Sequence, residues 1–272
     1  MNGDFTMGAK TIAEGVVVQD YVDLGLPSGT LWMDRNVGAS SPEDAGLYFA
    51  WGETTGYTAD VVGKTKQFSW NDYKYANGAY NKLTKYCNDS NYGNDGYTDG
   101  LTTLETTDDA VLQNVHKYSM PTTEQFEELI DNTASTWTTQ NGVNGMLFTS
   151  KTNGNSIFVP AAGNGHDGLV SSVGLSGSLW SSSLDEDGVY NAWSFGFYNN
   201  AVTFPRWCRS EGLPVRGVAT QAEGSSITIT LPSSSGTLAL TSDVEAVKEE
   251  AANTYAVKDD LTKYLPLTFA AE

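Results

Sequence analysis

The sequence predicts a loop-rich fold of many short β-strands with two helices in its body, and three observations support this prediction. Charged residues make up only 18% of the 272 residues, whereas Gly (28), Tyr (14) and Trp (7) are abundant. Gly favours turns, and aromatic and β-branched side chains suit pleated surfaces. Short apolar runs are separated by Gly, Pro and Ser, and two segments carry the signals of a helix start.

The N-terminal part of the chain is expected to be short strands followed by a long loop. Residues 1–20 are interpreted as an arm, and strands with tight turns are expected over 21–24, 27–32 and 48–52. Residues 53–103 contain few apolar side chains and many Asn, Asp, Gly, Thr and Tyr, which predicts an irregular insertion. A compact domain rarely retains such a loop unless it has a function or packs its own aromatic rings.

Two helices are expected after this insertion. The first covers about 107–115, with the acidic pair 108–109 in its first turn, where the helix dipole favours negative charge. The second begins after Thr122, whose side chain can cap the helix while Gln125 completes a capping box. Apolar residues then recur at helical spacing as far as Asn132.

The chain then returns to β structure. Short runs rich in aromatic and aliphatic residues predict strands over 146–149, 156–160, 179–183, 192–197, 201–204 and 214–218.

A change in composition near residue 219 indicates a domain boundary. The predicted segments are an N-terminal arm (1–20), a ligand-binding body (21–219), a linker with two short strands (220–241) and a helical tail (242–272). Ser242 can cap the last helix, whose apolar residues form a narrow seam at three- and four-residue steps. A seam this narrow on an isolated helix usually packs against copies of itself, so self-association is expected.

The charge of the chain excludes some partners. The net charge is −18, from 15 Lys and Arg against 33 Asp and Glu. Nucleic acids and anionic membrane surfaces are therefore excluded as main partners, because both require clustered basic side chains. No run approaches the roughly 20 apolar residues of a membrane-spanning helix. The first ten residues lack the basic and apolar regions of a secretory signal, so we expect neither export by that route nor membrane insertion.

Residues suited to catalysis are few and scattered, and we expect no enzymatic activity. His116 lies at the end of a predicted helix and His166 in a turn-rich loop. The carboxylates lie mainly in turns and helix starts, without a spacing that marks an acid–base pair. Cys87 and Cys208 form no Cys-x-x-Cys motif. They could pair, but free and partly buried thiols are the favoured interpretation.

One oxygen-rich loop could bind calcium. Residues 88–95 include Asp89, Asn91 and Asp95 in a glycine-containing stretch, and oxygen ligands suit Ca²⁺. The loop departs from the EF-hand pattern because Gly100 stands where the final Glu would be. Turn formation explains the same residues. No cofactor is therefore predicted, and Ca²⁺ is the alternative.

The segment from Trp180 to Val218 is the best candidate for a binding surface. Phe195, Phe197 and Val202 alternate with smaller or polar neighbours and are expected to face inward. The other rings, amides and hydroxyls exceed what one sheet face buries, and such side chains suit a sugar or a protein. The alternative is that most of these rings belong to the core. The candidate ligand-binding residues are Asp185, Asp187, Tyr190, Asn191, Trp193, Ser194, Tyr198, Asn199, Asn200, Thr203, Arg206, Trp207 and Ser210.

Several ordered motifs carry a resemblance to a known family. They are VDLGLPSGTLW, NVGASSPEDAGLYFAWGET, DDAV with MPTTEQFEELI, NGVNGMLFTSKTNGNSIFVPAAG, LWSSS and RSEGLPVRGV. Between Tyr21 and Val218 the chain resembles the Fibrobacter/Bacteroides major paralogous domain family, which is related to the formylglycine-generating-enzyme version of the C-type lectin fold. The resemblance implies an α+β, C-type-lectin-like domain with two helices and a twisted antiparallel sheet.

The variable proteins of diversity-generating retroelements share that fold, and residues 180–218 look like their hypervariable region. The resemblance implies that display positions stand on a scaffold, and these positions would be Tyr190, Asn191, Ser194, Tyr198, Asn199, Thr203, Arg206 and Ser210. The members of the scaffold would be Trp180, Arg209, Gly212, Val215 and Arg216. Trp193, Trp207 and Glu211 cannot arise from adenine changes in an Asn codon, so either they are fixed or the retroelement interpretation fails. Formylglycine-generating activity needs closely placed cysteines in the C-terminal half, where this chain has only Cys208.

The tail carries a second resemblance. Residues 227–243 are similar to a segment common in bacteriophage tail-fibre proteins. Together with the self-associating helix, this implies a tail-fibre adhesin of the virion, with three copies in a fibre, that binds a host cell-surface glycan or protein. A bacterial surface or secreted adhesin of the same family is the alternative. An enzyme of the formylglycine-generating type is the third interpretation.

Overall fold

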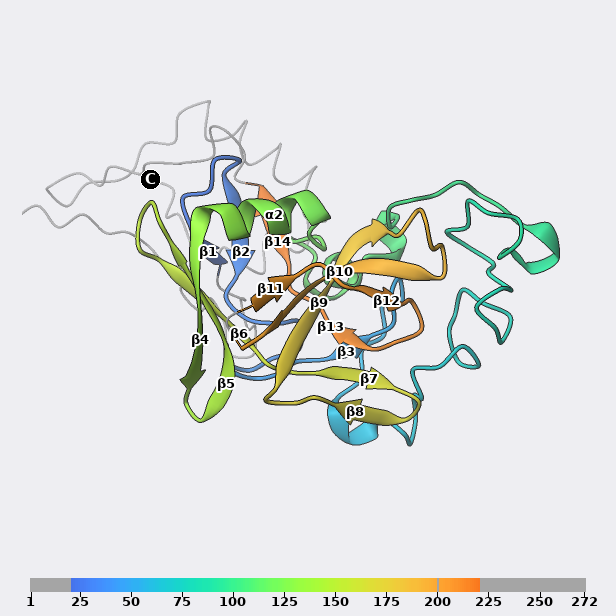
Figure 1. The fold of residues 1–272 in the computed structure, drawn as a ribbon, viewed down its shortest axis with the longest axis horizontal. Helices are drawn as coiled ribbons and strands as arrows, with labels where there is room; N and C mark the ends of the chain where they lie inside the picture. Colours follow the sequence, from blue (N-terminus) through green and yellow to red (C-terminus); the bar gives the residue numbers. More distant parts are fainter. Residues whose placement is uncertain (1–20, 200, 221–272) are drawn as a thin grey trace, which may run out of the picture. The chain divides into compact units, whose positions relative to one another are not determined.

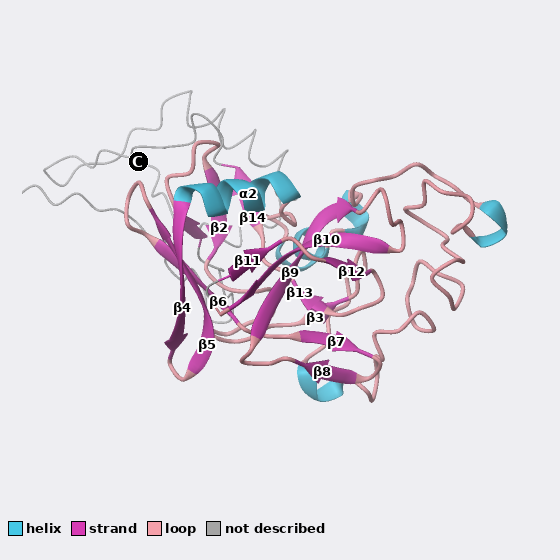
Figure 2. Ribbon diagram, in the orientation of Figure 1, coloured by secondary structure: helices cyan, strands magenta, loops and turns pink. Residues whose placement is uncertain are grey.

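The computed structural model describes residues 21–199 and 201–220, and these residues form an α+β fold. Short strands in antiparallel sheets are accompanied by two α-helices, α1 (Ala110–Val115) and α2 (Thr123–Asn132), and α2 lies along one side of the sheets (Figures 1 and 2). Among the described helices, none is long and apolar enough to cross a membrane. The predicted arm (1–20), the tail-fibre-like segment (227–243), the helical tail (242–272) and Asn200 lie outside the described residues.

The two ends of the described domain meet in one sheet. Strands β1 (Tyr21–Asp23) and β14 (Val218–Thr220) pair on either side of β2 (Thr30–Met33), all antiparallel. Trp32 lies opposite both Val22 and Val218, and its side chain is fully buried. The sheet therefore brings β1 and β14, which lie almost 200 positions apart in the chain, to either side of the buried Trp32.

The helices confirm the prediction of α2 and correct the start of α1. Thr122 Oγ1 accepts a hydrogen bond from the Gln125 amide, and the Gln125 side chain accepts one from the Thr122 amide, so the capping box is present. Helix α1 begins at Ala110, because Asp109 caps it by accepting from the amides of the second and third residues. Residues 106–108 form the 3-10 turn η3 (Thr106–Asp108) instead.

Three strands after α2 form an antiparallel meander. They are β4 (Thr133–Gln140), β5 (Val143–Ser150) and β6 (Ser156–Pro160). The sequence predicts β5 and β6 but not β4. The β4 sequence, TASTWTTQ, is mostly polar, and only its first residue is buried. A strand that leaves most side chains in solvent has no apolar alternation to signal it.

The central sheet is built from the segment that was predicted to bind a ligand. Its strands are β9 (Ser176–Leu184), β10 (Asn191–Tyr198), β11 (Ala201–Thr203) and β12 (Arg206–Cys208). Strand β9 pairs with one edge of β10, and β11 and β12 share the other edge (Figure 1). The sequence does not predict β12, which is only three residues long.

Both faces of the central sheet are covered. One core, around Trp51 and Trp180, includes Ala192 and Leu184 of the sheet. A second core, around Trp32 and Phe126, includes Phe195 and Phe197. The two phenylalanines are buried as predicted, and Val202 packs against them from a partly buried position. All five residues expected to be scaffold, namely Trp180, Arg209, Gly212, Val215 and Arg216, are buried.

Two small sheets complete the described fold. Strand β3 (Tyr48–Phe49) pairs with β13 (Leu213–Pro214), and β7 (Asn164–His166) forms a hairpin with β8 (Leu169–Ser171), which the sequence does not predict. The single strand predicted over 214–218 is wrong, because β13 and β14 belong to different sheets. Between them the chain crosses a crowded point at Gly217, where a Cβ atom would lie 2.5 Å from Val111 Cγ1.

The insertion at 53–103 is irregular, as predicted. Its helical structure is confined to the 3-10 turns η1 (Ala59–Val61) and η2 (Asn94–Gly96), and Figure 1 shows much of it as the cyan and green loops that extend away from the sheets. It packs its own apolar cluster, in which Leu83 and Cys87 contact Val189 of the β9–β10 turn. The insertion therefore touches the candidate binding segment directly.

Candidate ligand-binding surface

An aromatic ring and a cation stack at one end of the central sheet. Trp193 of β10 and Arg206 of β12 are cross-strand partners, and the Arg206 guanidinium lies 4.5 Å from the Trp193 ring centroid. The Arg206 side chain is 46% exposed and the Trp193 ring is half-buried. Arg206 Nε lies 3.6 Å from Asp185 Oδ2, and the Asp185 carboxylate is itself buried. We call Asp185, Asn191, Trp193 and Arg206 the Trp193–Arg206 cluster, since Asn191 lies on the same face of β10 as Trp193.

Tyr190 belongs to a cluster of three tyrosines next to this strand end. Its ring centroid lies 5.5 Å from that of Tyr80 and 5.3 Å from that of Tyr92, both of which belong to the insertion. Tyr80 is 49% exposed, and the other two rings are half-buried. Tyr80 and Tyr92 are not predicted from the sequence, because no local pattern connects them to a residue about 100 positions later.

Arg209 holds the two parts of this surface together from beneath. It is fully buried and donates hydrogen bonds to the carbonyls of Lys85, Tyr86 and Val189 and to the Tyr73 hydroxyl. Its guanidinium also lies 5.2 Å from the Trp51 ring centroid. Its own amide donates to the Tyr190 carbonyl. The insertion and the β9–β10 turn are thus fixed to one buried cation.

Two predicted residues lie on the opposite face of the sheet. Successive side chains of a strand alternate between faces, and Trp193 and Tyr198 are five residues apart. Tyr198 is 55% exposed and shares its face with Thr203, which pairs with Gly196. The structure therefore divides the predicted residues between two separate surfaces instead of one strip.

Other predicted residues support the surface from inside the fold. Ser194 is fully buried, and its hydroxyl donates to the Pro205 carbonyl. Ser210 is buried as well. Trp207 pairs with Ala192 and packs against the first core, facing away from Trp193. Ser194 and Ser210 therefore offer a ligand little or no contact area in this conformation, and Trp207 is half-buried.

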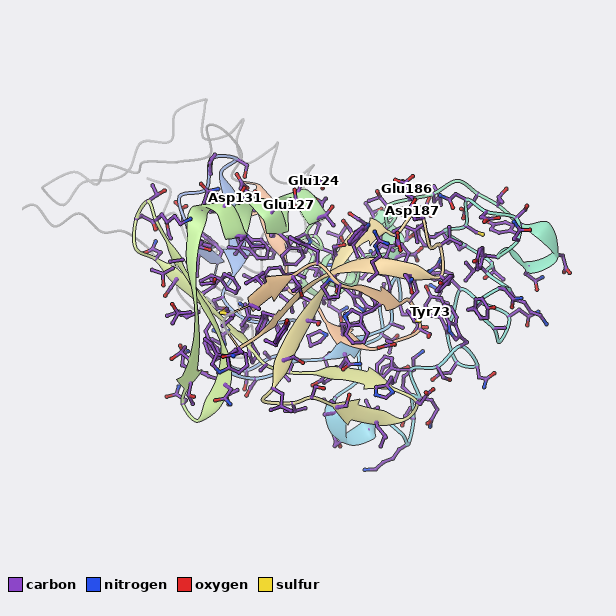
Figure 3. All side chains as sticks on the ribbon, viewed as in Figure 1. Tyr73, Glu124, Glu127, Asp131, Glu186 and Asp187 are labelled. Carbon is purple, nitrogen blue, oxygen red and sulfur yellow. The ribbon has the colours of Figure 1, made fainter. Side chains whose placement is uncertain are left out.

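The remaining predicted residues lie in turns. Asp187 is exposed in the β9–β10 turn beside Glu186, well away from the acidic residues Glu124, Glu127 and Asp131 along α2 (Figure 3). Asn199 is exposed in the β10–β11 turn with a positive φ of 44°, a conformation that Asn tolerates better than most residues.

The side chains proposed as calcium ligands are engaged in turns. Asp89 Oδ1 accepts hydrogen bonds from the backbone amide and the side-chain amide of Asn91. Asp95 accepts one from the Asn94 side chain and has a φ of 53°. Within residues 21–199 and 201–220, no group of three or more His, Cys, Asp or Glu side chains could hold a metal ion.

The two cysteines are free thiols in the structure. Cys87 is fully buried and Cys208 is half-buried. Burial raises the pKa of both thiols above the usual value, so neither is activated as a thiolate. His116 ends α1 in the left-handed conformation, and His166 ends β7.

Comparison of the chain with protein-family models, with curated proteins and with solved structures finds no match in any of the three. The family resemblance of the sequence motifs therefore stays a prediction.

Proposed function

We propose that the protein is a non-enzymatic receptor-binding protein with a C-type-lectin-like body, used as a tail-fibre adhesin of a bacteriophage. The observation that carries the proposal is the Trp193–Arg206 cluster: a half-exposed ring and an exposed guanidinium, stacked and braced by a buried carboxylate. Trp, Tyr and Arg are the residues that most often dominate binding energy at interfaces. The observed α+β architecture agrees with a lectin-like body but is not specific to one.

The geometry favours recognition by a rigid surface. Strand pairing fixes the backbone of Trp193 and Arg206, and their side chains stack on each other. The Tyr190 ring packs against two other tyrosine rings, so little side-chain freedom would be lost on binding. Aromatic rings can stack on the apolar face of a sugar, while Arg and Asn side chains bind its hydroxyls. A protein receptor could use the same groups, so the proposed ligand is a glycan or a protein on the host cell.

The proposal is tested by the binding of the labelled full chain to Bacteroides-type cells. Arg206→Ala and Trp193→Ala should each weaken binding about tenfold or more, as expected for central interface residues. Tyr198→Ala is the matched control, because it removes an exposed ring from the same strand on the opposite face. Loss of binding in the Tyr198 variant alone would place the binding site on the face of the sheet that carries Tyr198. Unchanged binding in all three variants would contradict the proposal.

We propose that binding needs no calcium. The carboxylates of Asp89 and Asp95 already accept hydrogen bonds within their own turns, and they belong to the insertion rather than to the Trp193–Arg206 cluster. Cell binding should therefore be equal in about 2 mM CaCl₂ and after addition of excess chelator. This calcium concentration is of the order that saturates weak extracellular sites. A loss on chelation would support the calcium alternative.

The assignment to a virion rests on the tail segment and is tested separately. Self-association through 242–272 would raise the avidity of weak single sites by about 10²–10⁴. Light scattering of the full chain should give a mass of three copies. Flanking phage tail genes would support the virion location, whereas flanking polysaccharide-use genes would favour the bacterial adhesin.

A further inference from the structure

A polar cleft of about 350 Å³ opens at the start of the insertion. Its walls come from the turn after β3 and from residues 65–74, and it shares no residue with the Trp193–Arg206 cluster. The lining residues are Glu53, Thr54, Thr55, Tyr57, Thr65, Lys66, Asp72 and Lys74. Every one of these side chains carries a hydroxyl, a carboxylate or an ammonium group.

The floor of the cleft is a buried ion pair. Lys66 Nζ donates to both oxygens of Glu53, at 3.0 and 2.8 Å, and to the Asp72 carbonyl at 2.7 Å. Both side chains are at least nine-tenths buried. These bonds use all three donors of the ammonium group, so Lys66 positions Glu53 and has no donor left for a ligand.

The walls of the cleft carry hydroxyls without partners. Within residues 21–199 and 201–220, the structure gives no hydrogen bond to the side-chain hydroxyls of Thr54, Thr55, Tyr57 or Thr65. Tyr57 lines the cleft together with Glu53 and Asp72, and burial, followed by the charges of these two carboxylates, raises the pKa of Tyr57. Asp72 Oδ2 accepts one hydrogen bond, from the Gln67 amide, and a carboxylate oxygen can accept a second.

The charges of the cleft decide the class of ligand. Two acidic and two basic residues line it, so the formal charge of its lining is zero, and the Lys74 ammonium is paired with Asp108 at 3.5 Å. The Lys66 ammonium lies 2.8 Å from Glu53 and 3.9 Å from Asp72, where it would repel a metal ion. An anion would meet the two carboxylates, and an apolar ligand would leave polar groups desolvated without hydrogen bonds.

We infer that this cleft binds a neutral cyclic polyol of the size of one pyranose sugar. The hydroxyls of such a ligand can donate to Glu53 and Asp72, and they can donate to or accept from the Thr and Tyr hydroxyls. The volume lies at the lower end of the range for small-molecule sites. The inference goes beyond the proposed function and does not depend on it.

Ligand-observed NMR with the full chain tests this inference. The probes are the methyl α-D-pyranosides of glucose, galactose and mannose and myo-inositol, with glycine betaine and inorganic phosphate as comparison ligands. At least one polyol should bind. Tyr57→Phe and Thr65→Val each remove one hydroxyl and should weaken that binding by about 2- to 12-fold, the effect of one hydrogen bond.

Tyr21→Phe and Thr136→Val are the matched controls, because they remove the same two groups from exposed positions of β1 and β4. Their polyol affinity should equal that of the wild type. Absence of binding by every polyol, binding of betaine or phosphate in place of a polyol, or equal losses in site and control variants would overturn the inference. Because cell binding is tested with Trp193 and Arg206, failure of either idea leaves the other measurable.

Discussion

Arg209 is a fully buried cation whose charge is met by carbonyl oxygens and aromatic faces, with no carboxylate within salt-bridge distance among the described residues. Arg209→Leu keeps much of the volume but leaves three carbonyls without their donor. Each buried group left without a hydrogen bond costs about 1–3 kcal/mol. The variant should therefore lose at least about 3 kcal/mol of the free energy of unfolding, measured by urea denaturation with tryptophan fluorescence.

Lys82→Leu is the control for this measurement. Lys82 is an exposed cation of the insertion, so its replacement should change the free energy of unfolding by no more than about 0.5 kcal/mol. Equal losses in the two variants would show that Arg209 does not have the supporting role assigned to it.

Residue roles could be predicted only where burial and pattern agree. The scaffold residues are all buried, and Phe195 and Phe197 face a core as the alternation predicts. Ser194 and Trp207 show why the remainder could not be predicted. Both faces of the central sheet are covered near β10, so a polar or aromatic residue at an alternating position can be buried on either side.

At the scale of single elements, the N-terminus of α2 depends on one side chain. Thr122→Ala removes the acceptor of the Gln125 amide and should lower the free energy of unfolding by about 1 kcal/mol. Thr123→Ala at the first helical position is the control, and it should leave stability nearly unchanged because Ala is the better helix former. The midpoint of urea unfolding measures both, and a larger loss at Thr123 would contradict the assigned cap.

Local signals explain which elements the sequence predicts. The capping box and the helical spacing of α2 are contained in the eleven residues from Thr122 to Asn132, and the predicted bounds are those observed. Strand β4 and hairpin β7–β8 pair with neighbouring segments, but β4 is mostly polar and β7 and β8 are only three residues long, so no apolar alternation marks them. The separation of β13 from β14 depends on partners distant in the chain, because β13 pairs with β3 and β14 pairs with β2. The Tyr80–Tyr92–Tyr190 contacts have the same origin, because only the folded insertion brings them together.

At the scale of the whole domain, one buried carboxylate ties the insertion to the rest of the fold. Asp108, in the turn before α1, accepts hydrogen bonds from the hydroxyls of Tyr75 and Tyr86 and from the Lys85 ammonium. Burial alone would raise the pKa of Asp108, but these donors outweigh it and hold the pKa below its usual value. The same balance, with backbone amides as donors, lowers the pKa of Asp72 and Asp99.

These shifts set the direction of the pH dependence. A carboxyl group with a lowered pKa in the folded state contributes stability above its unfolded pKa of about 3.9, and the contribution is lost as pH falls through the folded value. Burial raises the pKa of Asp109 and Glu211, and such groups give the opposite slope over the neighbouring pH range. Because Asp108 accepts hydrogen bonds from three side chains, we expect its protonation to dominate the change in the free energy of unfolding at acid pH.

The free energy of unfolding should therefore be nearly constant between pH 7 and 5 and fall below about pH 4. Asp108→Asn should be less stable than the wild type by about 1.5–3 kcal/mol at pH 7, the value of a hydrogen bond to a charged group. The difference should shrink toward pH 2, where the wild-type carboxylate is also protonated. Urea unfolding at 0.15 M salt, which screens the repulsion of a chain with net charge −18, measures it. Asp187→Asn, in an exposed turn, should follow the wild-type profile. A constant difference for Asp108→Asn at every pH would mean that packing, and not the charge of Asp108, holds the insertion in place.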